Sequence, residues 1–266
     1  MTILEKIKQY KLKEIEQIER NKSIYELQRE PYLLREIYSL KQRLQDETQS
    51  GIIAEFKRAS PSKGIIHQNA NVKRITTGYK KAKVSALSVL TDSHFFQAQK
   101  NDFATARKYN AIPILRKDFI VSDYQILETK AMGADVILLI ASILEAKEIQ
   151  LFASIAKNLG LEVLLEVHTQ SEIEEKFCDE IDIIGINNRN LHTFEVDIEN
   201  SIRLAQSLPN NLPKIAESGI NDTATLLRLK DNGFQGFLIG EQFMKQEKPA
   251  VACRQFVEAL QNLKTP

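Results

Sequence analysis

Short apolar runs rich in β-branched residues recur from Gly51 onward, and amphipathic stretches of helical length lie between them. The runs are Ile52–Phe56, Ala86–Leu90, Ile112–Leu115, Val136–Ile140, Val163–Val167, Ile181–Ile186, Lys214–Ala216 and Gly236–Ile239. Near-continuous apolar strands that alternate with helices are typical of a parallel sheet covered on both faces. Eight such runs within about 200 residues predict an α/β fold, a (β/α)8 TIM barrel.

The signals that begin and end helices agree with this reading. Gly133, Gly160 and Gly233 each stand between an amphipathic stretch and the next apolar run, where a helix is expected to end. Ser142 and Ser171 are each followed three residues later by a glutamate, which is the spacing of a capping box. We therefore expect helices to begin at these two serines.

An open, doubly wound sheet is the alternative architecture. Such a sheet normally has a glycine-rich turn after its first strand, but here Lys57–Gly64 (KRASPSKG) follows the first run. Neither the GxGxxG pattern nor the P-loop pattern occurs in the sequence. The closed barrel is therefore favoured.

Residues 1–50 differ from the rest, because they are crowded with Lys, Glu, Gln and Arg and contain no convincing strand. Four apolar residues after Pro31 fall at helical spacing: Leu33, Ile37, Leu40 and Leu44. This stripe predicts a helix packed on the main domain, with a more polar helix upstream. We expect residues 1–266 to form a single barrel domain, with residues 1–50 as a helical extension packed on it.

Composition narrows the classes of function. Lys and Arg (36) balance Asp and Glu (35), which argues against a nucleic-acid surface but allows a small anionic substrate. The two cysteines and four histidines show no paired or metal-binding spacing, so neither a disulfide framework nor a metal site is expected. The charged N-terminus does not resemble a signal peptide, and no run is long enough to cross a membrane. These features predict a soluble cytoplasmic protein.

Polar side chains close several predicted strands, which is where a barrel has its active site. Glu55 and Lys57 end the first strand, two residues apart and therefore on the same face, and Lys117 ends the third. Glu166 lies inside the fifth apolar run, where a carboxylate is costly unless it is paired. Burial should raise the pKa of Glu166 toward that of a general base, with Lys57 and Lys117 as its partners.

The last strands suggest a phosphate site. Ser218–Gly219 follow the seventh run and Gly240 follows the eighth, which matches the usual position of an anion held by backbone N–H groups in a barrel. Four further polar residues receive no role and are expected to be structural: Asp118, Glu217, His94 and His192.

With these residues in place, the chain closely resembles the indole-3-glycerol phosphate synthase family. The matching segments are Ile53–Ser62 (IAEFKRASPS), Leu90–Asp92 (LTD) with Phe95–Phe96, Ile114–Ile120 (ILRKDFI), Leu165–His168 (LEVH), Gly185–Leu191 (GINNRNL) and Ala216–Ile220 (AESGI). They occur in the family's order and cover nearly the whole chain. Two departures are Ala98, where glycine is usual, and Glu241, where some relatives have serine.

The resemblance implies a carbon–carbon lyase of tryptophan biosynthesis. It would convert 1-(2-carboxyphenylamino)-1-deoxyribulose 5-phosphate to indole-3-glycerol phosphate, with loss of CO2 and water and without a cofactor. Matching positions imply that Lys117 is the acid for ring closure and that Glu166 is an acid–base partner in the later steps. Lys57 would bind the carboxylate or phosphate end of the substrate and is a candidate second acid. A crowded cationic rim should help one lysine release its proton, but the sequence leaves open which lysine acts in which step.

The resemblance also implies binding roles. Glu55 and Asn187 would hold substrate hydroxyls or position Lys117, and Arg189 would contact the anthranilate side. The remaining expected substrate contacts are Ser60, the phosphate-binding Ser218, Gly219 and Gly240, and the aromatic-pocket walls Phe96, Phe119 and Leu191.

Two other functions stay open at this point. One is a different phosphate-binding barrel enzyme such as phosphoribosylanthranilate isomerase, which needs an Asp/Cys pair, and neither Cys178 nor Cys253 lies at a predicted strand end. The other is a non-catalytic phosphate-binding barrel, against which the intact Lys57, Lys117 and Glu166 argue. The expected partner is the small phosphorylated substrate, with no nucleic acid and no membrane. A monomer is expected, with other tryptophan-pathway enzymes as candidate partners.

Overall fold

A closed barrel of parallel strands forms the centre of the computed structural model, which describes residues 3–190, 195–209 and 211–263. Within these residues the barrel strands are β1 (Ile52–Phe56), β4 (Ala86–Leu90), β5 (Ile114–Lys117), β6 (Val136–Ile140), β7 (Glu162–Val167), β8 (Ile183–Asn187), β9 (Lys214–Glu217) and β10 (Gly236–Ile239). Their order around the barrel follows the chain, and β1 pairs with both β4 and β10 to close it. The predicted (β/α)8 barrel is confirmed.

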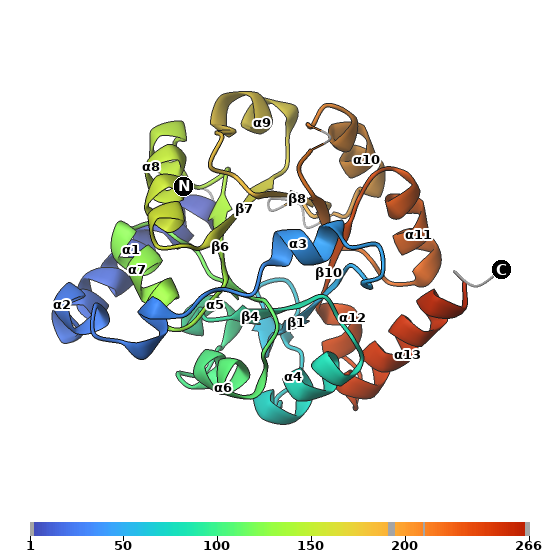
Figure 1. The fold of residues 1–266 in the computed structure, drawn as a ribbon, viewed down its shortest axis with the longest axis horizontal. Helices are drawn as coiled ribbons and strands as arrows, with labels where there is room; N and C mark the ends of the chain where they lie inside the picture. The colour runs from blue at the N-terminus through green and yellow to red at the C-terminus, as the bar shows by residue number, and fades with distance from the viewer. Residues whose placement is uncertain (1–2, 191–194, 210, 264–266) are drawn as a thin grey trace.

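Helices follow the barrel strands and surround them (Figure 1). They are α4 (Val72–Lys81), α5 (Ser93–Phe96), α6 (Asp102–Tyr109), α7 (Asp123–Ala131), α8 (Ala146–Asn158), α9 (Gln170–Lys176), α10 (Ile198–Gln206), α11 (Thr223–Asp231), α12 (Glu241–Met244) and α13 (Pro249–Asn262). A short hairpin lies between β1 and α4. Its two strands, β2 (Ala59–Ser60) and β3 (Gly64–Ile65), have two residues each. Gly133, Gly160 and Gly233 follow α7, α8 and α11 with positive φ, so the three predicted helix ends are confirmed.

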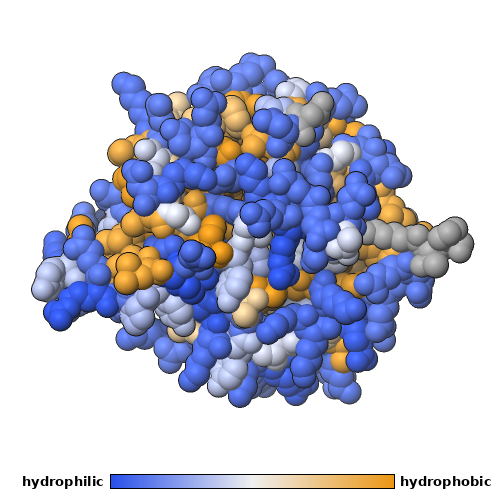
Figure 2. Space-filling model, viewed as in Figure 1, coloured by the Kyte–Doolittle hydropathy of each residue, from blue (hydrophilic) through white to orange (hydrophobic). Residues whose placement is uncertain are grey.

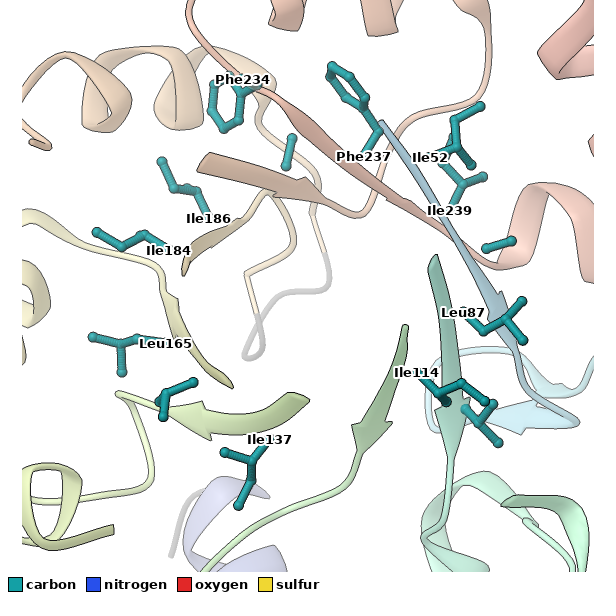
Figure 3. Packing of buried hydrophobic residues seen from close by; sticks show 14 of the residues in the cluster. Ile52, Leu87, Ile114, Ile137, Leu165, Ile184, Ile186, Phe234, Phe237 and Ile239 are labelled. Carbon is teal, nitrogen blue, oxygen red and sulfur yellow. The ribbon is translucent and has the colours of Figure 1, made fainter. Parts of the chain in front are cut away.

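Side chains alternate between the two faces of the strands, because successive residues of a strand point in opposite directions. One set packs against the surrounding helices, and Figure 3 shows Ile137, Leu165 and Ile184 pointing away from the barrel axis. The other set, which includes Ile53, Leu164 and Ile215, fills the barrel interior. The residues of this inner set that come last in their strands are therefore presented at the carboxyl end of the barrel.

The N-terminal extension contacts both ends of the barrel. It consists of α1 (Ile3–Asn21), α2 (Ile24–Leu27), the 3-10 helix η1 (Pro31–Leu34) and α3 (Leu40–Gln45). Figure 1 shows α3 lying across the ring of strands, and Leu40 and Leu44 belong to the interior cluster. Glu162, the first residue of β7, accepts hydrogen bonds from the backbone of Leu40 and Lys41, so α3 covers the amino end of the barrel.

The prediction of one continuous helix carrying Leu33, Ile37, Leu40 and Leu44 is wrong. Residues 35–39 lie between η1 and α3 and belong to neither helix. Arg35 pairs with the buried Asp135 at 2.7 Å, and the same carboxylate accepts the backbone N–H of Tyr38. These contacts with the barrel outweigh the local helical spacing of the stripe.

The two predicted capping boxes are also wrong in position. The boxes are formed instead by Glu145 with Glu148 at the start of α8 and by Thr169 with Glu172 at the start of α9. Three strand starts differ as well: β5 begins at Ile114, after the proline that lacks an N–H, β7 begins at Glu162, and β8 begins at Ile183 rather than Ile181. Because Ser, Thr and Glu are frequent in this sequence, more than one position near each helix start has the spacing of a capping box, and the sequence alone does not decide which of them forms it.

The face in Figure 2 is mostly hydrophilic, with hydrophobic residues visible in patches between polar ones. No helix in the described part of the chain is long and apolar enough to span a lipid bilayer.

Candidate active site

A cavity of about 360 Å³ lies at the carboxyl end of the barrel. Of the site residues predicted from the sequence, all but Leu191 line this cavity. They are Glu55, Lys57, Ser60, Phe96, Lys117, Phe119, Glu166, Asn187, Arg189, Ser218, Gly219 and Gly240. Leu191 lies outside the described residues, as does His192. Side chains from most of the barrel strands and from the N-terminal extension thus meet in one place.

Lys117 lies between two carboxylates in this cavity. Its Nζ is 2.6 Å from Oε2 of Glu166 and 2.8 Å from Oε2 of Glu217. Asn187 donates a hydrogen bond of 2.9 Å to the other oxygen of Glu166, so both oxygens of that carboxylate are engaged. The expected pairing of Glu166 with Lys117 is present, whereas Lys57 pairs with Glu55 instead.

The pKa values in this group differ from the expectation. Burial favours the neutral form of Glu166, but attraction to Lys117 and His168 and the Asn187 hydrogen bond outweigh it and lower the pKa to about 2. Burial raises the pKa of Glu217 to about 7 against the attraction of Lys117, and the charge of Glu166 adds to that rise. The predicted upward shift in Glu166 is therefore wrong, and Glu217 is the carboxyl with a raised pKa.

The expectation that a lysine on this rim gives up its proton easily is wrong for Lys117. Burial opposes its charge, yet Glu166 and Glu217 together raise its pKa well above the usual range. Lys117 is therefore an ammonium ion in the ligand-free site. One ammonium ion and two carboxyl groups share a single buried cluster, in which a proton can move between close neighbours.

Glu217 is the site residue that the sequence analysis missed. It is 2% exposed, and its Oε1 has no hydrogen-bond partner among the described residues. A signal was present: Glu217 follows Ile215 by two residues, as Glu55 follows Ile53, and Ile215 and Ile53 both face the barrel interior. The other residues set aside behave differently, since Asp118 is bound by Lys11, Arg116 and Thr91, and His94 stacks on Tyr10.

Glu55 and Lys57 form a second ion pair, next to Gly240. Lys57 Nζ lies 2.6 Å from Oε1 of Glu55. A Cβ on Gly240 would overlap with that same carboxylate oxygen, so only glycine leaves room for Glu55 here. The geometry gives Gly240 a packing role besides any contact with a ligand.

Ser218 and Gly219 both have a left-handed backbone in the cavity wall. Both have positive φ, 67° at Ser218 and 75° at Gly219, and left-handed geometry at a non-glycine residue is strained. Backbone N–H groups of successive residues in a turn, or in right- and left-handed conformations one after the other, can form a concave group of donors that attracts anions. A strained serine beside glycine in the cavity wall is consistent with the predicted phosphate position.

The remaining walls are aromatic and apolar. The rings of Phe96 and Phe119 lie 6.0 Å apart, and both line the cavity. Leu4 and Ile7 of α1 also line it, so the extension completes the site. Arg189 approaches Glu241 at 3.8 Å, which draws this carboxylate toward a cation at the rim.

Lys11 fixes α1 above the site. Its side chain is 2% exposed, and its Nζ lies 2.6 Å from Asp92 and 3.0 Å from Asp118. Burial opposes the charge, but the attraction of Asp118 and Asp92 raises the pKa of Lys11 above its usual range. Since Asp118 follows Lys117 directly, the anchor of α1 adjoins the central lysine.

The described part of the chain holds no group of three or more His, Cys, Asp or Glu residues that could bind a metal ion. The charged groups of the cavity are instead arranged as ion pairs.

Comparison with known proteins identifies similar chains. A family model described as indole-3-glycerol phosphate synthase matches residues 4–256. A protein of that name from Bacteroides thetaiotaomicron is 50% identical over 212 residues, which cover 80% of this chain and 81% of that protein. Another from Legionella pneumophila (strain Paris) is 39% identical over 257 residues, covering 96% of this chain and 98% of that protein.

Solved structures with low sequence identity share the fold. A mutant tryptophan synthase alpha-subunit from Pyrococcus furiosus has a TM-score of 0.62 at 14% identity, covering 80% of this chain and 98% of that one. A thiamine phosphate pyrophosphorylase from Pyrococcus furiosus has a TM-score of 0.58 at 16% identity, covering 84% and 99%. These likenesses concern the barrel alone.

Proposed function

This chain belongs to the indole-3-glycerol phosphate synthase family, and on that premise we propose that it closes the indole ring of 1-(2-carboxyphenylamino)-1-deoxyribulose 5-phosphate. The product would be indole-3-glycerol phosphate, formed in tryptophan biosynthesis with release of CO2 and water. The enzyme is then a carbon–carbon lyase. The observation that carries the proposal is Lys117, held between Glu166 and Glu217 in the cavity.

The reaction makes definite demands on acids and bases. The ring carbon that bears the carboxylate attacks the ketone carbon, and the ketone oxygen takes up a proton. The carboxylate leaves as CO2, and its bonding electrons restore the aromatic ring. The new hydroxyl takes a second proton and leaves as water, while the carbon next to nitrogen loses one proton. Each turnover therefore consumes one proton from solvent.

Lys117 is the group best suited to protonate the ketone oxygen. Its ammonium ion is fully formed because Glu166 and Glu217 raise its pKa, and it can stabilise the developing oxyanion. The lysine must release its proton once substrate is bound, and protonation of Glu217 would assist this by removing one negative neighbour. Glu217 therefore joins Lys117 in the proposed catalytic group.

Glu166 is the proposed base that removes the proton from carbon. Its pKa of about 2 keeps it ionised at neutral pH and ready to accept a proton. The contact of 2.6 Å with Lys117 then returns that proton to the lysine. Asn187 holds the carboxylate in position from its other oxygen.

The other cavity residues would bind the substrate. Backbone N–H groups at Ser218, Gly219 and Gly240 would hold the phosphate, which keeps the Glu241 carboxylate out of direct contact with it. Glu55 with Lys57 would bind hydroxyls and the carboxylate end. The remaining proposed contacts are Ser60, Arg189 at the anthranilate side, and Phe96 with Phe119 as aromatic walls; the same role is proposed for Leu191.

Phosphoribosylanthranilate isomerase activity has less support. That reaction needs an aspartate and a cysteine as its acid–base pair, but neither Cys178 nor Cys253 lines the cavity. Burial raises the pKa of Cys253 to about 12, which suits a packing residue of α13 rather than a proton donor.

A fluorescence assay tests the proposed function. Purified protein is mixed with the carboxyphenylamino substrate in the presence of a chelator, and formation of the fluorescent indole product is followed. We expect steady product formation without added metal or nucleotide. Absence of product, or isomerisation of phosphoribosylanthranilate instead, would contradict the proposal.

We also infer that the enzyme acts as a cytoplasmic monomer, alone or beside other enzymes of the pathway. The two free cysteines support the location, because unpaired thiols are typical of a reducing compartment. Sedimentation of the purified protein would test the oligomeric state.

A further inference from the structure

The imidazole of His168 lies next to Glu166 and is not among the residues that line the cavity. Its Nε2 is 3.7 Å from Oε1 of Glu166, and its Nδ1 is 3.9 Å from Oε2 of Glu172. His168 itself does not line the cavity, whereas Glu166 does. A titratable ring therefore separates the proposed base on β7 from a second carboxylate on α9.

Both nitrogens of this ring are shielded from solvent, and neither has a hydrogen-bond partner within the described structure. A buried polar atom without a partner is costly, so it rarely occurs without a reason. Glu166 and Glu172 are the charged groups within ion-pair reach of the ring in the described part of the chain. An imidazolium ion between two carboxylates relieves the cost, and a small rotation of the ring would bring Nε2 within hydrogen-bonding distance of Glu166.

Glu172 is held in place independently of the ring. Its Oε2 accepts the backbone N–H of His168 at 2.6 Å and that of Thr169 at 3.1 Å, as part of the capping box of α9. Its side chain is 15% exposed, so Glu172 itself can exchange protons with water. The three groups make a continuous line from the cavity wall to the surface.

We propose that His168 is a proton relay for Glu166, supplying the proton that each turnover consumes; this rests on the proposed ring closure. Because His168 does not line the cavity, a route through this ring gives the acid–base group a supply of protons that does not pass through the cavity. His168 acts through Glu166 and does not touch substrate, so it is a positioning and relay residue.

The proton transfers balance over one cycle. Lys117 protonates the ketone oxygen and becomes neutral. The His168 imidazolium gives its Nε2 proton to Glu166, which passes a proton to Lys117, and the lysine then protonates the leaving hydroxyl. Glu166 removes the proton from carbon and returns it to Lys117. The lysine is again an ammonium ion and Glu166 is again a carboxylate. The neutral His168 ring, still protonated on Nδ1, then flips so that its bare Nε2 faces Glu172, and it regains its missing proton there from water through the Glu172 carboxylate.

Turnover by His168→Asn tests the relay. Asparagine is close in size but cannot exchange a proton, so we expect kcat to fall about 100-fold with KM little changed. The solvent deuterium isotope effect on kcat should increase. The matched control is His67→Asn, because His67 is a partly buried histidine outside the cavity whose Nδ1 contacts the Met244 carbonyl. This control should keep wild-type kcat.

Chemical rescue separates proton transfer from packing. His168→Ala should recover activity when imidazole is added, and substituted imidazoles should rescue in proportion to their acidity rather than their size. Glu172→Gln keeps the cap but loses the charge, so we expect a smaller fall in kcat and no further loss when it is combined with His168→Asn. Wild-type kcat in His168→Asn, or rescue that follows size alone, would overturn the relay.

A measurement without substrate distinguishes failure of the relay from failure of the proposed function. In the ligand-free protein, nitrogen NMR of labelled histidine records the ring nitrogen signals of His168 in wild type and in Glu166→Gln. Replacing the carboxylate should change the chemical shift of the Nε2 signal, because the group facing this nitrogen changes from a charged to a neutral one. Identical spectra would overturn the relay even if the wild type forms indole product, and a changed Nε2 signal would support it even if the substrate proves to be different.

Discussion

Lys117 and Glu217 contact each other across the full width of the barrel, with Nζ 2.8 Å from Oε2. Their strands, β5 and β9, stand on opposite sides of the ring, since three strands separate them in either direction. Only inward-facing side chains at the same height can meet in this way. The contact couples the charge of the central lysine to a carboxyl whose pKa lies close to neutral.

Replacing Lys117 should remove ring closure. In Lys117→Ala, no ammonium ion remains to protonate the ketone oxygen, so we expect kcat to fall by about 1000-fold or more. The fold should survive, because loss of the cation allows Glu217 to take up a proton and relieves repulsion from Glu166. Product fluorescence and a circular-dichroism melt measure the two effects, and the exposed Lys81→Ala is the control. Near-wild-type turnover would remove Lys117 from its central role.

Glu217 should give the reaction a pH dependence near neutrality. Its pKa is raised to about 7, so it is neutral below that pH and charged above it. The charged form holds the proton more firmly on Lys117, so we expect kcat to decrease as pH rises through this range.

The variant Glu217→Gln is neutral at every pH and should lose this decrease. The measurement is kcat at one pH unit below and at one pH unit above the pKa of Glu217. The ratio of these two kcat values should be close to one in the variant. If the same inflection persists in Glu217→Gln, another group is responsible for it.

Lys11 should stabilise the fold and the substrate site together. Lys11→Met leaves Asp92 and Asp118 buried without their shared cation, so we expect the free energy of unfolding to fall by about 3–5 kcal/mol. KM should rise, because α1 also places Leu4 and Ile7 against the cavity. Urea unfolding and steady-state kinetics measure these changes. Lys13→Ala, an exposed lysine on the same helix, should leave both unchanged.

The pH range of the Lys11 contribution follows from its pKa, which Asp118 and Asp92 raise in the folded state. The stabilisation is complete below the ordinary lysine pKa and is lost only as pH rises through the higher folded value. The difference in unfolding free energy between wild type and Lys11→Met should therefore stay constant from neutral to weakly alkaline pH. A difference that disappears near neutrality would assign the effect to another group.

The Ser218–Gly219 loop should determine phosphate affinity. In Gly219→Ala the new Cβ would overlap with Val196, and the positive φ is unfavourable for alanine, so the loop must shift. We expect inorganic phosphate to inhibit the variant about tenfold less strongly, which corresponds to about 1.4 kcal/mol. Gly233→Ala is the matched control, since Gly233 also has positive φ but lies away from the cavity and leaves space for a Cβ. Equal loss of phosphate affinity in both variants would contradict the assignment.

The barrel itself could be predicted because its signals are local. Four of the eight apolar runs match their observed strands at both ends, and two more, Val163–Val167 and Lys214–Ala216, are one residue short. A strand that is buried on both faces must be apolar whatever its neighbours are, so its sequence alone identifies it. The helix-ending glycines are equally local, because the left-handed backbone at Gly133 requires a residue without a Cβ.

The extension could not be predicted to the same degree. The stripe from Leu33 to Leu44 has helical spacing, but Asp135 on the barrel binds Arg35 and the Tyr38 backbone and interrupts the helix. The partner that decides this segment lies about 100 residues away in the sequence. Such a contact leaves no periodic signal in either segment.

The sequence by itself determined the barrel, the rim on which the site lies and twelve of the residues that line the cavity. Only the tertiary structure decided which charges face one another. Glu166 seemed in isolation to be the carboxyl with a raised pKa, yet Lys117, His168 and Asn187 lower it, and Glu217 takes the upward shift instead. The physical reason is that a pKa depends on distances of a few ångströms between groups on different strands, which strand order and register fix and which the spacing of residues along the chain does not contain.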